Sequence, residues 1–163
     1  GSVRCAYEPG STRRRRFTSE MAETLAMSAS AMAKKFNGSL RVTTSPRTAG
    51  IADMVINLLD APSQVYRWGC DDENPYVGYL ACADMIIVTG DSISMCTEAC
   101  ASTVPVYLFA PPGLVSNKHG RFHQHLYKAG YAQDLSTGRE AHPHSPLNPG
   151  IDIAEAIQQI MGQ

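Results

Sequence analysis

The stretch MIIVTGDSISM (Met85–Met95) decides the fold of this 163-residue chain. Its first five residues form an almost unbroken apolar run of strand length, which predicts a strand covered on both faces. A Gly-Asp-Ser turn ends that strand, and residues 94–102 follow as a predicted helix. A doubly covered strand that leads through a tight turn into a helix is typical of a parallel sheet in an α/β fold.

Strand and helix patterns alternate on both sides of this stretch. Thr18 is a predicted N-cap for a helix whose apolar residues recur at helical spacing as far as Phe36. Asn74-Pro75 has the form of an N-cap followed by proline at the first helical position, and opens a helix through Ala83. The other predicted elements are strands at residues 3–7, 40–44, 64–68 and 106–110, helices at 51–59, near 121–129 and at 153–161, and a loop at 136–150.

This alternation predicts an α/β fold with a doubly wound, mostly parallel, Rossmann-like sheet in three α/β/α layers. Ligands of such folds bind outside the carboxyl ends of the strands, an edge that we call the rim. Residues 8–16, 44–48, 69–75 and 90–94 are expected to lie along the rim. Candidate functional residues are therefore drawn mainly from these four segments.

Composition indicates an ordinary globular domain. Apolar residues are 44% and charged residues 18% of the chain, which argues against disorder and allows a core of real size. The formal net charge of −1 predicts neither nucleic-acid nor membrane binding, and no apolar run approaches the roughly 20 residues of a membrane span. No signal peptide opens the chain, and Val3 begins a predicted strand without a lead-in, so we expect one domain of a longer protein.

The five cysteines indicate free thiols rather than a disulfide framework, because their number is odd and no C-x-x-C pair occurs. This pattern favours a reducing, cytoplasmic location. Cys96 and Cys100 lie four residues apart, and two small core residues are far more common in that arrangement than a metal pair.

Two rim segments predict phosphate binding. In residues 9–16, Ser11, Arg13 and Arg14 belong to a run that places four arginines before a helix, where a bound anion would offset their unfavourable position. The alternative is a solvated basic turn. In residues 89–98, Ser92 and Ser94 follow a buried strand at a helix start, and Glu98 lies one turn on, within reach of a ribose. The alternative is a serine that only caps the helix.

A third rim segment contains Trp68, which either stacks on a base or packs in the core. The following Asp71-Asp72-Glu73 run is more typical of solvated charge than of a metal site, because consecutive carboxylates converge poorly on one ion. His119 and His123 lie four residues apart but lack a third zinc ligand, and His142 and His144 are expected in solvent. No metal and no cofactor is therefore predicted.

The run ENPYxGYLACADMIIVTGDSISMCTEA (Glu73–Ala99) resembles a signature of the mitochondrial-fission ELM (elongated mitochondria) family. Further matches are SLRVTTSPRT (39–48), Pro105-Val106-Tyr107, and Arg121-Phe122-His123 with a following Ala-Gly pair. They occur in the family's order over most of the chain. Bacterial members of this family are often described as nucleoside-diphosphate-sugar epimerases, but a Tyr-x-x-x-Lys pair and a dinucleotide fingerprint are lacking here.

The resemblance implies a GT-B glycosyltransferase architecture, of which this chain is similar to the carboxyl-terminal, nucleotide-sugar-binding half. The positions that it assigns to the donor cleft are Thr44, Ser45, Arg47, Asn74, Tyr76, Asp91, Ser92, Ser94, Met95 and Glu98. The chain departs from the family after the first strand, where Tyr7-Glu8-Pro9-Gly10 replaces the usual glycine pair, and beyond Asp134.

Two functions follow from this resemblance. The first is a domain that binds a nucleotide or nucleoside-diphosphate sugar. If the whole protein is an enzyme, it is a metal-independent glycosyltransferase whose catalytic base comes from an amino-terminal domain, so that this domain is not catalytic alone. The second is a non-catalytic adaptor at the mitochondrial outer surface of a eukaryote, since plant members help to bring a dynamin-related protein to mitochondria.

Overall fold

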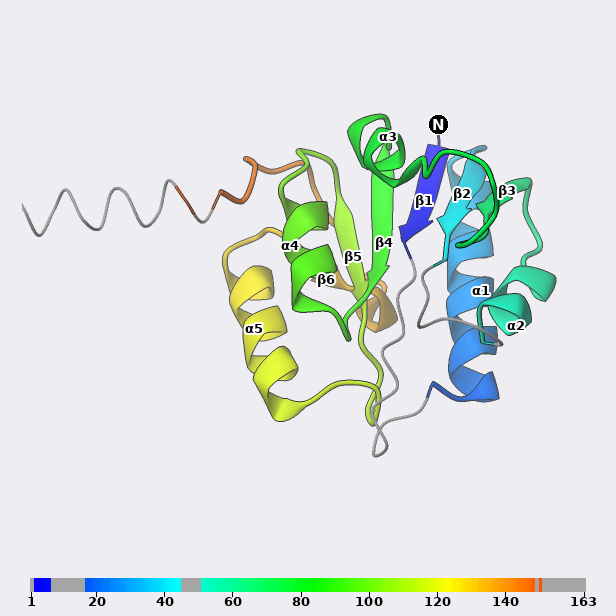
Figure 1. Ribbon diagram of the computed structural model, residues 1–163. Coiled ribbons are helices and arrows are strands. Elements are labelled where there is room, and N and C mark those ends of the chain that lie inside the picture. Colours follow the sequence, from blue (N-terminus) through cyan, green and yellow to red (C-terminus); the bar gives the residue numbers. More distant parts are fainter. Residues whose placement is uncertain (1, 7–16, 45–50, 149, 151–163) are drawn as a thin grey trace, which may run out of the picture.

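A parallel sheet forms the centre of the computed structural model, which describes residues 2–6, 17–44, 51–148 and 150 (Figure 1). Within these residues the sheet has six strands in the order β3-β2-β1-β4-β5-β6, and every neighbouring pair is parallel. The strands are β1 (Ser2–Ala6), β2 (Ser39–Thr43), β3 (Ser63–Tyr66), β4 (Met85–Thr89), β5 (Val106–Phe109) and β6 (Gln133–Asp134). The predicted doubly wound, Rossmann-like sheet is confirmed.

The sheet separates two apolar cores, as the burial of β4 shows. All five residues of β4 are buried, and their side chains alternate between the faces. Met85 and Ile87 belong to the core beneath α1 (Ser19–Lys35) and α2 (Ile51–Asn57). Ile86 and Val88 belong to the core beneath α4 (Ile93–Cys100) and α5 (Asn117–Lys128). The three-layer arrangement follows, with helices on both faces of the sheet (Figure 1).

Hydroxyl side chains cap three of the helices, α1, α4 and α5. Thr18 accepts a hydrogen bond from the Met21 N–H at 3.2 Å, which confirms it as the N-cap of α1. The short helix α3 (Tyr76–Ala81) begins one residue later and ends two residues earlier than predicted, and Asn74 Oδ1 accepts from the Tyr76 N–H at 3.0 Å. The predicted start of α5 near residue 121 is wrong, since Ser116 caps the helix. The first turn of α5 is polar, so it shows no apolar periodicity from which the start could be predicted.

Two small elements lie outside the predicted pattern. The strand β6 consists of two polar residues, so its sequence carries no strand signal, and its pairing with Tyr107 and Leu108 of β5 defines it. A single 3₁₀ turn, η2 (Leu135–Thr137), follows it inside the predicted loop. The predicted helix at 153–161 lies outside the described residues.

The segment after η2 is tied to the body of the domain. The Ala141 N–H donates to the Tyr107 hydroxyl at 2.9 Å, and the Leu147 N–H donates to the Cys100 carbonyl, at the end of α4, at 2.8 Å. His144 stacks edge-on against Tyr131 with ring centroids 5.5 Å apart, so its predicted exposure to solvent is wrong.

Each face of β4 is expected to contribute separately to stability. Replacing Ile86 or Ile87 with alanine removes a fully buried side chain from one core, and each change should lower the free energy of unfolding by about 2–5 kcal/mol. Urea unfolding monitored by circular dichroism measures this. Val77→Ala, at a position 74% exposed, is the control and should change stability by less than about 0.5 kcal/mol. A loss of that small size for either isoleucine would contradict the two-core packing.

Candidate functional site

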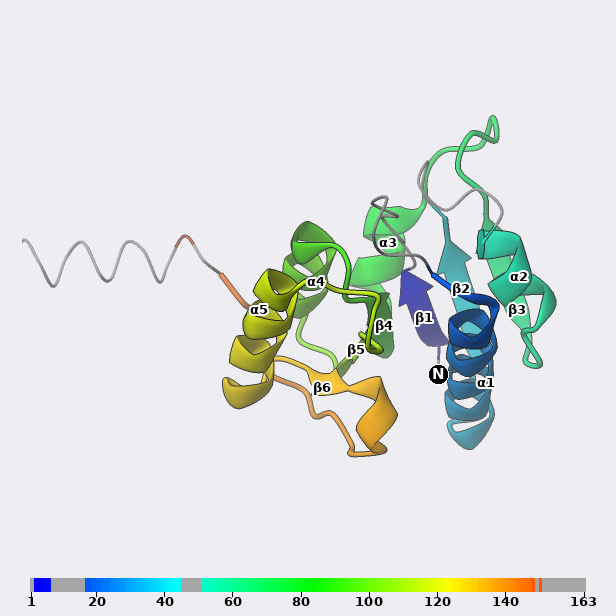
Figure 2. The ribbon, with the colours of Figure 1, turned by 90° about the horizontal axis from the view of Figure 1, so that it is seen from below.

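The rim lies at the edge seen in Figure 2, where the parallel strands finish together. The strands β1 and β4 are neighbours, yet the chain continues from them to helices on opposite faces, α1 and α4. In doubly wound sheets the ligand crevice forms at such a point. Five predicted site residues lie outside the described residues, namely Ser11, Arg13, Arg14, Ser45 and Arg47.

The turn between β4 and α4 brings two predicted hydroxyls together. Ser92 is buried and caps α4, accepting from the Met95 N–H at 3.4 Å. Ser92 therefore caps the helix, and this role is compatible with ligand binding. Its Oγ lies 3.1 Å from that of Ser94, whose side chain is exposed. A helix start with an exposed hydroxyl beside backbone N–H groups suits an anion.

Glu98 lies farther along α4 and meets a second predicted residue. The Tyr76 hydroxyl donates to Glu98 Oε2 at 2.7 Å, and this bond joins the first residue of α3 to α4. The carboxylate is exposed, and its second oxygen accepts no hydrogen bond from the described part of the chain. Of the remaining predicted residues in this region, Asp91 and Met95 are half-buried and Asn74 is exposed.

A second group lies where β2 and β3 end. The Trp68 N–H donates to Thr44 Oγ1 at 2.8 Å, so the threonine hydroxyl holds the two strand ends together. The Trp68 side chain is 54% exposed, and the predicted alternative of core packing is wrong. Because β1 separates β2 from β4, Thr44 lies about 10 Å from the turn at Gly90, two strand spacings away.

His123 and Gly90 form a contact that the sequence analysis missed as part of the site. A Cβ added to Gly90 would lie 2.5 Å from Cε1 of His123 and 2.9 Å from Cβ of Ala110, so only glycine fits there. The imidazole is buried on α5, against the residue that opens the β4–α4 turn. The Arg121-Phe122-His123 motif, one of the matches to the family, was the available sequence signal for His123. It could not show that His123 contacts Gly90 at the end of β4.

The other clusters named in the sequence do not form sites in the described residues. Asp71, Asp72 and Glu73 are exposed, and no group of three metal-binding side chains converges within the described ranges. Cys96 and Cys100 are buried core residues as predicted, and burial raises the pKa of both thiols. None of the described helices has the length and apolarity to cross a membrane.

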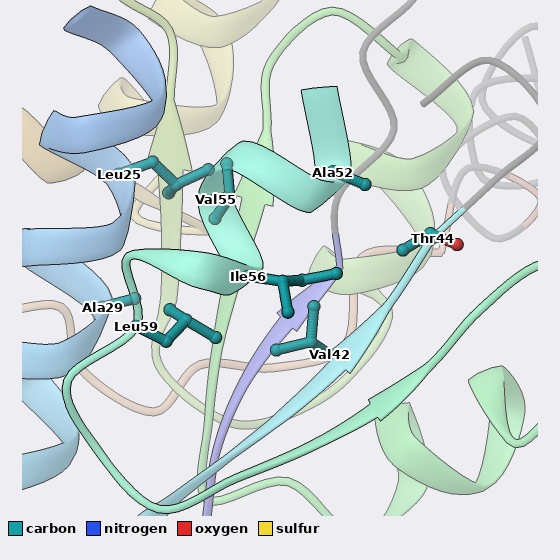
Figure 3. Close-up of a pocket in the computed structure, with 8 residues that line it drawn as sticks. All are labelled: Leu25, Ala29, Val42, Thr44, Ala52, Val55, Ile56 and Leu59. Carbon is teal, nitrogen blue, oxygen red and sulfur yellow. The ribbon is translucent and has the colours of Figure 1, made fainter. Parts of the chain in front are cut away.

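One apolar hollow lies away from the rim crevice, between α1, β2 and α2 (Figure 3). Leu25, Val42, Val55 and Ile56 point toward one another there. The enclosed space is about 10 Å³, at the lower limit for a single water molecule. It is a gap in the packing and too small for a ligand.

Comparisons with known proteins identify the family of the chain. A family model described as "Mitochondrial fission ELM1" matches residues 10–161. The chain is 34% identical over 128 residues to the mitochondrial fission protein ELM1 of Arabidopsis thaliana, covering 76% of this chain and 29% of that protein. It is 37% identical over 123 residues to the uncharacterized protein RP120 of Rickettsia prowazekii, covering 72% of this chain and 35% of that protein. The chain thus spans about a third of the length of these relatives.

A solved structure shares the fold. The glycotransferase of kitacinnamycin matches 83% of this chain and 31% of its own length, with a TM-score of 0.52 and 15% sequence identity. At that identity the likeness concerns the fold alone. It confirms the predicted Rossmann-like fold.

Gly90→Ala is expected to destabilise the protein, because the new methyl group would lie 2.5 Å from Cε1 of the buried His123 ring and 2.9 Å from Cβ of the half-buried Ala110. The free energy of unfolding should fall by about 1–3 kcal/mol in urea titrations. Gly78→Ala is the matched control, since nothing lies within 4 Å of a Cβ there and the residue is helical. It should raise stability by up to about 1 kcal/mol. Equal effects of the two substitutions would contradict the close packing at Gly90.

Proposed function

This chain belongs to the mitochondrial fission ELM1 family, and on that premise we propose that it is the nucleotide- or nucleotide-sugar-binding domain of a GT-B-like protein. The observation that carries the proposal is the corner from Gly90 to Glu98. There a hydroxyl pair at a helix start and an exposed carboxylate one turn farther on lie on one helix, beside the switch point of the sheet.

Each group at this corner matches one part of a nucleoside diphosphate. The Ser94 hydroxyl and the N–H groups of the first turn of α4 would bind phosphate, and the helix dipole favours the negative charge. The free oxygen of Glu98 would accept from the ribose hydroxyls, as acidic residues do in nucleotide-binding folds. Tyr76 would fix the orientation of that carboxylate through its 2.7 Å hydrogen bond.

Residues of the neighbouring rim segments would complete the site. The exposed ring of Trp68 offers a flat face to a base, held by its backbone bond to Thr44. Ser11, Arg13, Arg14, Ser45 and Arg47 are proposed as phosphate contacts from the segments that follow β1 and β2. With arginines and a helix dipole to balance the diphosphate, the proposed binding needs no metal.

The binding domain would be the carboxyl-terminal half of a two-domain protein. Its amino-terminal half would form the other wall of the cleft and, in an enzyme, supply the catalytic base for glycosyl transfer. The share of the relatives that the chain covers, 29% and 35%, is compatible with a protein that has a further domain.

Glu98→Gln is expected to weaken binding of UDP, GDP or their sugars by about tenfold or more, because a charged acceptor for the ribose is lost. Isothermal titration calorimetry measures the change. Glu23→Gln, an equally exposed helix position on α1, is the matched control and should bind like the wild type. If neither this chain nor the natural full-length protein binds any of these ligands at millimolar concentration, the proposal is wrong.

A second candidate function is a non-catalytic adaptor in organelle division, and the charge on α5 favours it. Lys118, Arg121 and Lys128 are exposed at spacings that place them along one side of the helix. None of them takes part in the ion pairs between described residues, and residues 99–133 contain no Asp or Glu. This basic face would bind an acidic surface of a dynamin-related protein, in the cytoplasm at the mitochondrial outer surface of a eukaryote.

Charge reversal separates the two functions. Arg121→Glu should weaken co-sedimentation with the dynamin-related protein about tenfold while leaving nucleotide affinity unchanged, because the basic face lies outside the rim crevice. Arg139→Glu, also exposed but outside α5, is the control and should leave recruitment intact. Equal recruitment by both variants would contradict an adaptor surface on α5.

A further inference from the structure

His123 is a buried polar side chain whose hydrogen bonding is incomplete. Its side chain is 2% exposed, and its Nε2 atom has no partner among the described residues. A buried polar group without a partner lowers stability, so its presence in a packed core calls for an explanation. A phenyl ring of similar shape would fill the same space without that penalty.

The ring lies directly behind the turn of the proposed site. The position of a Cβ on Gly90 is 3.1 Å from Nε2, so the imidazole edge contacts the residue that leads β4 into Ser92 and Ser94. On its own helix the ring packs between Phe122 and Tyr127, with centroids 6.2 and 6.4 Å away. Any charge on this imidazole therefore acts on the β4–α4 turn through a packed, dry interior.

Burial of His123 favours the neutral imidazole in the empty protein. Burial lowers its pKa, the Gly90 backbone opposes that shift, His119 on α5 adds to it, and Asp134 on β6 opposes it. Asp134 is already engaged, since its Oδ1 accepts from the Ser136 N–H at 2.8 Å and the Ser136 hydroxyl at 2.6 Å. The other titratable groups in this region are Tyr127 on α5, Cys96 on α4 and Asp91 after β4.

We infer that His123 is the counter-charge of the ligand site, neutral when the site is empty and protonated when a nucleoside diphosphate binds at the β4–α4 turn. This inference rests on the proposed function and adds proton uptake to it. The bound diphosphate adds negative charge to that of Asp134, and this charge favours the imidazolium. His123 acts through the Gly90 turn and is a positioning residue that does not touch the ligand.

The sign of the effect follows from linkage. The pKa of His123 lies below its ordinary value of 6.5 without ligand and rises when the anion binds. Between the two pKa values binding takes up a proton, so affinity increases as the pH falls through that interval. A rise of one pKa unit corresponds to about tenfold tighter binding at low pH than at high pH.

The test measures binding of UDP-glucose and GDP-mannose, titrated separately between about pH 5.5 and 7.5. Both phosphates of these sugars are diesters and do not titrate in this range, unlike the terminal phosphate of a free diphosphate, whose pKa is about 6. Calorimetry in two buffers of different ionisation enthalpy gives the number of protons taken up. We expect uptake of a fraction of one proton below pH 6.5, and affinity that increases toward the acid end by up to about tenfold.

Substitutions test whether His123 is the residue that takes up the proton. His123→Gln should bind with the same affinity at every pH and take up no proton, whereas His125→Gln, at an exposed position two residues on, should behave like the wild type. If His123→Gln does not fold, the NMR titration of the wild-type histidine Cε1 protons decides, because one buried signal should shift its midpoint upward by about one pH unit on binding.

The outcomes distinguish this inference from the function on which it rests. Binding without proton uptake, or uptake that persists in His123→Gln, overturns the role of His123 and leaves the binding function standing. Absence of binding at every pH overturns both.

Discussion

The burial of β4 on both faces is the constraint on which the rest of the structure depends. Its five side chains divide between two cores, so helices must lie on both sides of the sheet to cover them. Chain connections to such a strand must cross over, which produces the parallel order with β1 and β4 side by side. The ligand crevice is a consequence of this order, because the chain leaves the two strands toward opposite faces.

The same constraint explains why the candidate site is built around Gly90. The strand must end before the chain enters α4, and at that point the ring of His123 and the Ala110 side chain already occupy the space beside the backbone. A glycine resolves the conflict, and the next residues are free to cap the helix. Core packing on one side of the turn and polar groups on the other are therefore separated by a single residue without a side chain.

The sequence predicted what depends on local patterns. The bounds of β4 were predicted to the residue, and the Thr18 cap was predicted by a hydroxyl before a periodic apolar run. The two-residue β6 was missed because its pairing with β5 is a long-range contact that leaves no pattern in polar residues. The contact between His123 and Gly90 was missed for a related reason, since the spacing of His123 from His119 does not reveal that its neighbour in space is Gly90. Ser92, Ser94 and Glu98 were chosen from their position after a buried strand, and Tyr76 from the family resemblance. The structure adds the hydrogen bonds that join Ser92 to Ser94 and Tyr76 to Glu98.

The hydrogen bond from Leu147 to the Cys100 carbonyl has a consequence for the order in which the domain is made. The start of α4 faces the rim, whereas this bond satisfies a carbonyl at the other end of the same helix. During translation α4 emerges long before Leu147. The hydrogen bond to its last turn therefore forms only after the segment that contains Leu147 has been made. The helix at the centre of the candidate site is completed by residues that the ribosome adds late, and a nascent chain that stops short of them lacks this tie.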